Sequence, residues 1–195
     1  MTLTLEGVAH PAVRPVAAAK DFASDDITEM YIVSGSGDWS VAAGYLKDAS
    51  NNDLGIIISS TGSGWPDWHA DARILVDSSS GGAGSEDAGV VLRFIDSNNF
   101  YLARVWDGKF VITRRSGGSF ATLKTESSIN IAEDTDYDIR FSIRGTSLNA
   151  QLLATNGTIL SSLSIADSTH TRGSCGFRCF ETAMWIKTFS FTQLV

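Results

Sequence analysis

The segment Tyr137-Asp-Ile-Arg-Phe-Ser-Ile-Arg144 decides the fold class, because apolar and polar side chains alternate along its whole length. Successive side chains of an extended chain point to opposite faces, so this segment buries one face and exposes the other. After a turn at Gly145 the alternation continues, with Leu148, Ala150 and Leu152 on one face. The sequence therefore predicts neighbouring half-buried strands in this region.

Two dipeptides predict tight hairpins. Asp107-Gly108 separates Tyr101–Trp106 from Lys109–Thr113, and Asn156-Gly157 leads into Ile159–Leu163. Both dipeptides favour a type I′ turn, in which the two central residues have positive φ.

The remaining runs are also typical of strands. Gly55–Ile58 and Ala88–Ile95 are apolar without alternation, which predicts central strands covered on both faces. Gly, Asn, Asp and Ser interrupt the runs, Ser78–Ser85 is expected to be a loop, and the only helical feature expected is a short turn near Asp25–Met30. This pattern predicts an all-β fold, a two-sheet antiparallel β-sandwich.

Composition and length indicate one folded domain. The 195 residues are 43% hydrophobic and 19% charged, as in packed globular proteins. Residues 1–20 differ from the rest, since they are rich in Ala and Val and hold Pro11 and Pro15. We therefore expect an N-terminal arm or attachment segment at 1–20 and the sandwich at 21–195.

Charge and the N-terminal residues exclude several functions. The net charge of −7 opposes binding to phosphate backbones, so nucleic acid and anionic membranes are not expected partners. The first residues lack the basic and apolar segments of a signal peptide, and no apolar run is long enough to cross a bilayer. We expect synthesis in the cytoplasm without a signal peptide.

Cys175 and Cys179 are predicted to be free, buried thiols. They lie on one face of an extended segment, where four strand steps separate their Cα atoms by about 13 Å. A disulfide tolerates only about 7 Å. His10, His69 and His170 show no metal-type spacing, so a zinc site is not expected.

Taken in order, several segments resemble the concanavalin A-like lectin and glucanase superfamily, particularly its laminin-G-like and sugar-binding jelly-roll branches. The similarity spans about Asp21 to Leu194. It is carried by Asp21-Phe22, Trp39–Leu46, Gly89–Phe94, Asp96–Arg104, Tyr137–Arg144, Leu148–Leu160, Asp167–Gly173, Cys175–Arg178 and Met184–Phe189. The resemblance implies a jelly-roll sandwich and binding of carbohydrate.

The resemblance does not extend to a complete calcium site. Many relatives hold a structural calcium ion with an Asp after the closing Trp-containing strand and another near the domain start, whereas this chain has Lys187 at the first position. We expect no cofactor, and the Lys187 ammonium is predicted to pair with Asp21 in place of the cation.

Two groups of residues are candidates for a sugar site, which needs aromatic faces and planar polar groups. The first is Trp65, Asp67, Trp68 and His69, around Pro66; the alternative is that each Trp packs in the core. The second is Arg93, Arg104 and Trp106; the alternative is that each Arg forms a salt bridge on an exposed face. Arg178 and Glu181 are expected to pair with each other.

No arrangement predicts hydrolysis. Glycosidases need two carboxyl groups across a cleft, and the glucanases of the superfamily place two Glu around an Asp on one strand. Asp134, Asp136 and Asp138 alternate, but they lead into a strand whose polar face is expected to be solvated.

The sequence thus favours a non-catalytic module that binds carbohydrate or a cell-surface glycan. An arm followed by a lectin-like domain is typical of a phage head decoration or fibre protein, with the arm attached to other virion proteins and the sandwich at the virion surface. A homo-oligomer is compatible with this role. The alternatives are a glycoside-cleaving enzyme of the same superfamily and a purely structural virion protein.

Overall fold

The computed structural model describes residues 17–22, 30–34, 39–48, 54–59, 64–76, 87–127, 129, 131–132, 134–180 and 184–194. The regular elements in these ranges are all strands: β1 (Ala17–Asp21), β2 (Met30–Ser34), β3 (Trp39–Ala42), β4 (Tyr45–Asp48), β5 (Leu54–Ser59), β6 (Trp68–Val76), β7 (Asp87–Asp96), β8 (Asn99–Trp106), β9 (Lys109–Ser116), β10 (Ser119–Glu126), β11 (Thr135–Arg144), β12 (Ser147–Ala154), β13 (Ile159–Ala166), β14 (Ser174–Phe180) and β15 (Met184–Gln193). Within them, no helix is long and apolar enough to cross a membrane.

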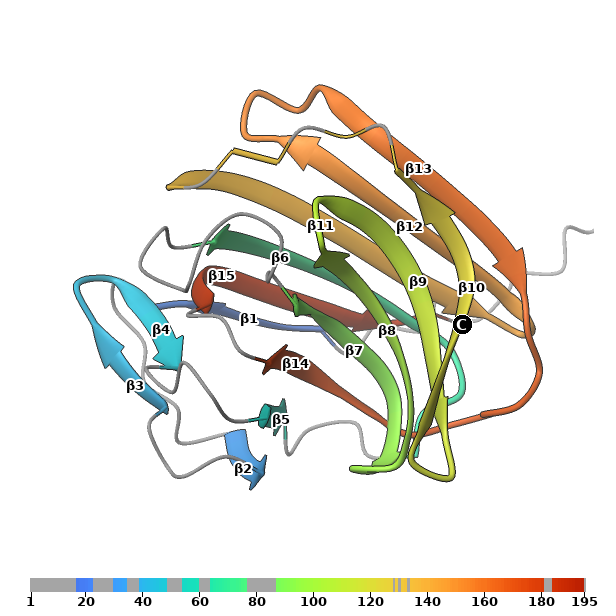
Figure 1. The fold of residues 1–195 in the computed structure, drawn as a ribbon. Helices are drawn as coiled ribbons and strands as arrows, with labels where there is room; N and C mark the ends of the chain where they lie inside the picture. Colours follow the sequence, from blue (N-terminus) through green and yellow to red (C-terminus); the bar gives the residue numbers. More distant parts are fainter. Residues whose placement is uncertain are drawn as a thin grey trace, which may run out of the picture.

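The strands form two antiparallel sheets packed face to face (Figure 1). In the described ranges, one sheet has eight strands in the order β13-β12-β11-β6-β15-β4-β3, with β1 paired to β15. The other has seven strands in the order β10-β9-β8-β7-β14-β5-β2. The predicted all-β sandwich is confirmed.

The segment that decided the fold class is strand β11. Tyr137, Ile139, Phe141 and Ile143 are buried, and the residues between them are partly or fully exposed. The strand lies between β12 and β6 in the eight-stranded sheet. Its alternation follows from this position, because one face packs on the other sheet and one face meets solvent.

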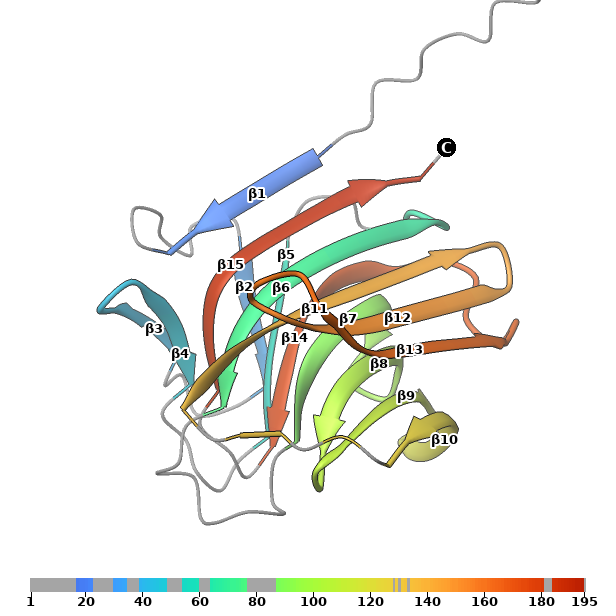
Figure 2. The same ribbon diagram turned by 90° about the horizontal axis from the view of Figure 1, so that it is seen from above.

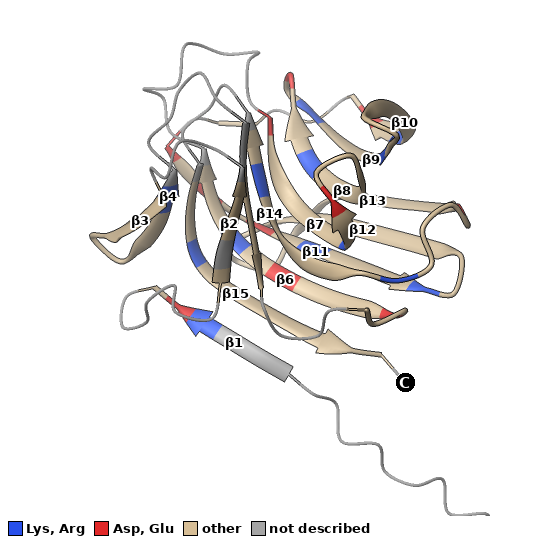
Figure 3. Cartoon of the chain, turned by 90° about the horizontal axis from the view of Figure 1, so that it is seen from below, with Lys and Arg blue, Asp and Glu red and all other residues tan. Residues whose placement is uncertain are grey.

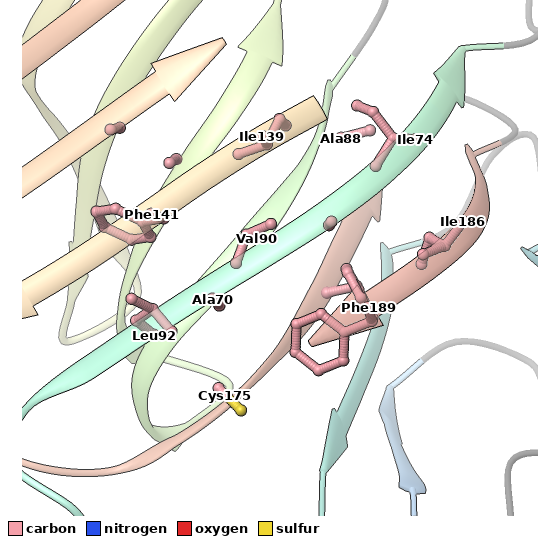
Figure 4. Close-up of a cluster of buried hydrophobic side chains, with 14 of the residues drawn as sticks. Ala70, Ile74, Ala88, Val90, Leu92, Ile139, Phe141, Cys175, Ile186 and Phe189 are labelled. Carbon is pink, nitrogen blue, oxygen red and sulfur yellow. The ribbon is translucent and has the colours of Figure 1, made fainter. Parts of the chain in front are cut away.

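The main core lies between the two sheets. Figure 4 shows side chains of both sheets in one cluster, with Val90 and Leu92 of β7 near Ile139 and Phe141 of β11. All four have no exposed surface. Burying side chains of this size stabilises a fold by about 1.5–3 kcal/mol each, and this burial holds the sheets together.

The apolar runs without alternation are covered on both faces, as predicted. Ile57 belongs to the core between the sheets, whereas Ile56 and Ile58 belong to a second apolar cluster with residues of β7 and β8. Residues 87–94 of β7 are also buried, but Ile95 is 55% exposed. The prediction of a doubly covered strand is therefore wrong at Ile95, because β7 reaches the surface before its end.

The Asp107-Gly108 hairpin is confirmed. Both residues have positive φ, 51° and 65°, as a type I′ turn requires. The turn joins β8 to β9.

The Asn156-Gly157 turn differs from the prediction. Of the two residues only Gly157 has positive φ, at 86°. Its N–H donates to the carbonyl of Ala154 at 2.9 Å, and the N–H of Ala154 donates to the carbonyl of Thr158 at 2.9 Å. This is a three-residue loop with a left-handed glycine at its end, so the type I′ prediction is wrong here. The Asn156 side chain supports the loop by accepting a hydrogen bond from the Thr158 N–H at 3.0 Å.

Both cysteines are free and buried on β14, as predicted. They lie in the core between the sheets. Burial raises the pKa of the Cys175 thiol well above its ordinary value, which keeps that side chain neutral.

The sheet begins within the segment predicted as an arm. Strand β1 pairs with β15, with Ala17 opposite Thr192 and Asp21 opposite Thr188 (Figure 2). The sandwich thus includes residues 17–20, ahead of the predicted boundary at 21. Residues 1–16, most of the turn predicted near Asp25–Met30, the predicted loop at Ser78–Ser85 and Glu181 lie outside the described residues.

Candidate functional site

The residues that the sequence proposes for a ligand site lie in three places. Trp65, Asp67, Trp68 and Arg93 meet at one end of the sandwich, as their shared hydrogen bonds show. His69 lies on the outer face of the eight-stranded sheet. Arg104 and Trp106 line a pocket on the outer face of the seven-stranded sheet and form the third group.

Arg93 is a buried structural residue. Its side chain is 2% exposed and donates hydrogen bonds to the carbonyls of Pro66 at 2.6 Å, His170 at 2.7 Å and Gly145 at 2.7 Å. It also pairs with Asp67 at 3.2 Å. Burial lowers the pKa of Arg93, and Asp67 opposes that effect. The guanidinium is thus occupied by the protein itself and is not offered to a ligand.

Trp68 is also occupied within the protein. It is fully buried, and its indole N–H donates to the carbonyls of Trp65 at 3.1 Å and Gly173 at 3.0 Å. The Trp65 ring, which is partly buried, packs on the Trp68 ring with centroids 4.8 Å apart. Asp67 accepts a hydrogen bond from the Gly145 N–H at 2.8 Å. Trp68 therefore packs in the core, as the alternative from the sequence proposed, whereas Trp65 is only partly buried against it.

A partly buried polar network lies beside Arg93. The Tyr101 hydroxyl donates to Asp167 at 2.5 Å and accepts from the His170 N–H at 3.0 Å. Arg114 also pairs with Asp167. Burial, with the Asp167 hydrogen bond second, raises the pKa of Tyr101 to about 12. Burial would raise the pKa of Asp167, but the hydrogen bonds from Tyr101 and Thr169 and the Arg114 charge outweigh it, so the pKa is lowered.

The Tyr101 pKa predicts a loss of stability in alkali. An unfolded tyrosine ionises near pH 10, so above that pH the unfolded chain releases a proton that folded Tyr101 keeps until about pH 12. The free energy of unfolding should fall by about 2–3 kcal/mol over this window, at about 1.4 kcal/mol per pKa unit. Urea denaturation at several pH values above 9 would measure it. Tyr101→Phe should show a flatter decline, and equal slopes in both proteins would contradict the assignment.

His69 has a partner on its own strand. Its Nε2 lies 2.9 Å from Asp71 Oδ2, and Asp71 also pairs with Arg140 of β11 at 3.3 Å. His69 and Arg140 line a small polar hollow of about 190 Å³ whose lining includes no Trp, Tyr or Phe. The hollow offers hydrogen bonds but lacks the large aromatic face on which a sugar ring stacks.

The outer face of the eight-stranded sheet has balanced charges. Arg73 forms a two-fold hydrogen bond with Asp138, at 2.8 and 2.9 Å, and Asp138 raises the Arg73 pKa. A pocket of about 420 Å³ on this face is lined by three basic and three acidic residues: Lys20, Arg73, Arg140, Asp21, Asp71 and Asp138. Figure 3 shows red and blue segments close together on β6 and its neighbours. The acidic and basic side chains that line this pocket are equal in number, and Arg73 and Arg140 form salt bridges with Asp138 and Asp71.

Lys187 does not have the partner predicted for it. Its ammonium lies 3.9 Å from Asp136, while its carbonyl accepts a hydrogen bond from the Phe22 N–H at 3.1 Å. The backbone thus brings Asp21 and Lys187 together, but the side-chain salt bridge is with Asp136. A lysine at this position supplies a positive charge and no ligand oxygen, so it does not fit a calcium site. In the described ranges no three His, Cys, Asp or Glu side chains gather as metal ligands.

The third place is a pocket of about 510 Å³ on the face of the seven-stranded sheet that is turned away from the core. Its lining residues come from five strands: Asp87 of β7, Arg104 and Trp106 of β8, Arg115 of β9, Phe120 and Thr122 of β10, and Arg178 of β14. The strand register explains this gathering. Gly89 of β7 lies opposite Arg104 on one side and opposite Arg178 on the other, so both arginines project from the same face.

The Asp87 carboxylate pairs with two arginines at the base of the pocket. Asp87 Oδ2 lies 2.5 Å from Arg104 Nη1 and 2.7 Å from Arg178 Nη1, and all three side chains are more than nine-tenths buried. Burial lowers the pKa of Arg104; Asp87 opposes this effect and the charge of Arg178 adds to it. Burial and the charge of Arg178 likewise lower the pKa of Arg115. The cations are therefore close enough to repel one another.

Two aromatic rings form the walls. Trp106 is 38% exposed and Phe120 is 40% exposed. The Phe120 centroid lies 4.9 Å from Cζ of Arg178 and 5.1 Å from Cζ of both Arg104 and Arg115. Such cation–π contacts fix the guanidinium planes beside the rings. The pocket thus combines exposed apolar faces with ordered planar donors.

Sequence reasoning identified two residues of this pocket and missed the rest. Arg104 and Trp106 were identified because they lie on paired strands and because an arginine is rarely buried without a partner. Asp87, Arg115, Phe120, Thr122 and Arg178 were not identified as site residues. Arg178 pairs with Asp87, and its predicted pairing with Glu181 stays a prediction, because Glu181 lies outside the described residues. One feature of the sequence could have pointed to the pocket. Asp87 and Gly89 stand at alternate positions at the start of an apolar strand, which places a carboxylate and a gap on the same face.

The chain is similar to solved structures of sugar-binding proteins, whereas no protein family and no curated protein sequence matches it. The carbohydrate-binding module CBM66 from Bacillus subtilis is 18% identical, with a TM-score of 0.67 over 83% of this chain and 93% of that one. The basic winged bean lectin with Tn-antigen is 9% identical, with a TM-score of 0.67 over 90% and 98%. The CBM2 module of the Lactobacillus casei BL23 phage J-1 evolved Dit is 13% identical, with a TM-score of 0.61 over 94% and 99%. Together with the two sheets, these similarities show that the chain has the concanavalin A-like jelly-roll fold.

Proposed function

We propose that the chain binds carbohydrate in the pocket formed by Arg104, Arg178, Trp106 and Phe120. The observation that carries this proposal is the pairing of exposed aromatic rings with buried guanidinium groups in one hollow. An aromatic face can stack on the C–H groups of a sugar ring, and planar donors orient its oxygens. The similarity to a carbohydrate-binding module and a lectin supports the same class of ligand.

The pocket favours binding over hydrolysis. Its single carboxylate, Asp87, is held by two arginines and does not face a second carboxyl group in the pocket. Glycoside cleavage needs two such groups across the scissile bond. Among Asp134, Asp136 and Asp138, the last two already pair with basic residues. We therefore propose a binding module that releases no reducing sugar from a polysaccharide it retains.

Replacing Trp106 by alanine is expected to weaken glycan binding about tenfold or more. Removing a Trp from the centre of a binding site costs about 2 kcal/mol, and about 1.4 kcal/mol is a factor of ten. A glycan array would identify the sugar, and calorimetric titration would compare the two proteins. Trp185→Ala is the matched control, because that indole lies on the other sheet, 5.5 Å from Tyr45. An array without signal at high protein concentration, or full binding by Trp106→Ala, would refute the proposal.

A phage virion is the proposed context for this binding. The phage module among the similar structures has the same fold over nearly its full length. In this proposal the sandwich recognises a host-surface glycan and residues 1–16, ahead of β1, attach the protein to other virion proteins. Virion genes next to the gene of this chain would support the context, and metabolic genes in their place would oppose it.

A further inference from the structure

The pocket on the seven-stranded sheet has the opposite charge from the rest of the molecule. Its lining contains three arginines and one aspartate, a formal charge of +2, whereas the whole chain carries −7. Figure 3 shows a basic segment on β14 and further basic segments on strands of the same sheet. The pocket of about 420 Å³ on the eight-stranded sheet has equal numbers of acidic and basic residues. The pocket on the seven-stranded sheet differs from it by an excess of positive charge.

Among the residues that line the pocket, one carboxylate, Asp87, faces the three arginines. Asp87 shares one oxygen between Arg104 and Arg178, and burial and mutual repulsion lower the pKa of Arg104. The buried Nε of Arg104 donates no hydrogen bond to any residue in the described ranges. An excess of positive charge in a desolvated site is unfavourable. Such an arrangement is favourable once an anion enters the pocket and pairs with the arginines.

We infer that this pocket takes a sugar that carries a carboxylate, such as a uronic or sialic acid. The inference rests on the proposed carbohydrate binding and names its ligand class. The carboxylate would lie against the guanidinium groups of Arg104, Arg115 and Arg178, with the sugar ring against Trp106. Every cation in the lining is an arginine, whose planar pair of donors matches the two oxygens of a carboxylate. The volume of about 510 Å³ lies within the usual range of small-ligand sites, about 300–1,000 Å³.

The test compares acidic sugars with the same sugars after their charge has been removed. The probes are oligogalacturonate, glucuronate oligosaccharides and sialyl oligosaccharides, each beside its methyl ester. We expect the acid to bind at least tenfold more tightly than the ester, and the difference should shrink when the ionic strength rises well above about 0.15 M. A sulfated neutral oligosaccharide serves as a second anion.

Arg115→Met is the informative variant, because Arg115 is only partly buried and is not one of the two arginines that pair with Asp87 at the base of the pocket. It should lose at least tenfold in affinity for the acid and keep its affinity for the ester. Arg140→Met, on the other sheet, should change neither. Equal melting temperatures would show that both variants are folded.

The outcomes separate this inference from the function on which it rests. If the acid and the ester bind equally and Trp106 is still required, the inferred recognition of a carboxylate is refuted and the proposed carbohydrate binding stands. Binding of the sulfated sugar without the acids would overturn it in favour of another anion. Absence of binding to every glycan would overturn both.

Discussion

Arg93→Met is expected to lower the free energy of unfolding by about 3–5 kcal/mol, the usual cost of breaking a buried charged network. Arg93 donates to three carbonyls, of Pro66, His170 and Gly145, and it pairs with Asp67. Methionine fills similar space but leaves these acceptors without a donor, and a buried unsatisfied acceptor costs about 1–3 kcal/mol. Chemical denaturation at neutral pH would measure the change.

Two further variants test whether the four contacts carry this effect. Arg93→Lys keeps the charge, but a single ammonium cannot reach four acceptors in different directions, so it should recover little of the loss. Arg140→Met removes a half-exposed arginine with one salt bridge of 3.3 Å, and should cost less than about 1 kcal/mol. Equal costs for Arg93→Met and Arg140→Met would contradict the structural role.

The role of Arg93 shows where sequence reasoning ends. The rule that arginine is rarely buried unpaired correctly required a partner. The partners are mostly backbone carbonyls from segments 27, 52 and 77 residues away. Backbone groups leave no trace in residue types, so a carboxylate or a ligand was the natural expectation. Arg93 also has φ of 50°, which no feature of the sequence indicated.

The fold itself was predictable because it depends on local patterns. Alternation in β11 and the continuous apolar run in β7 specified which strands meet solvent. The hairpins depended on loop length as well as on the dipeptide. Asp107-Gly108 joins its strands directly as a two-residue loop, whereas Asn156-Gly157 carries an additional loop residue and changes turn type.

Only a small part of the pocket was predictable, because the order of the strands in the sheet brings its residues together. Arg104 and Arg178 are far apart in the sequence, and they converge only because β8 and β14 flank β7. Asp87 begins β7 and reaches both. Without the register, each of these residues is consistent with an ordinary surface salt bridge.

The close approach of β7 to β8 predicts that Gly89→Ala costs about 3 kcal/mol or more, at the upper end of the penalty for overpacking. A Cβ on Gly89 would lie 2.2 Å from the carbonyl oxygen of Ala103 and 2.6 Å from both Cα and Cβ of Arg104. Backbone atoms cannot rotate away as a flexible side chain can, so the two central strands would have to separate. Chemical denaturation would measure the loss of stability. Crystallography would show whether the pocket changes shape, and glycan titration would measure its affinity.

Gly145→Ala is the matched control for this substitution. Its φ is 56°, and an added Cβ would meet nothing within 4 Å, so only the left-handed backbone is penalised, at about 1–2 kcal/mol. Gly89→Ala should therefore be the more damaging variant, although Gly145 and not Gly89 has the left-handed backbone conformation that penalises alanine. It should also weaken glycan binding in whatever fraction folds, because separating β7 from β8 moves Arg104 away from Asp87. A Gly89→Ala protein with the stability and affinity of the unmodified chain would show that the strands do not need this contact, and that the two arginines reach Asp87 without it.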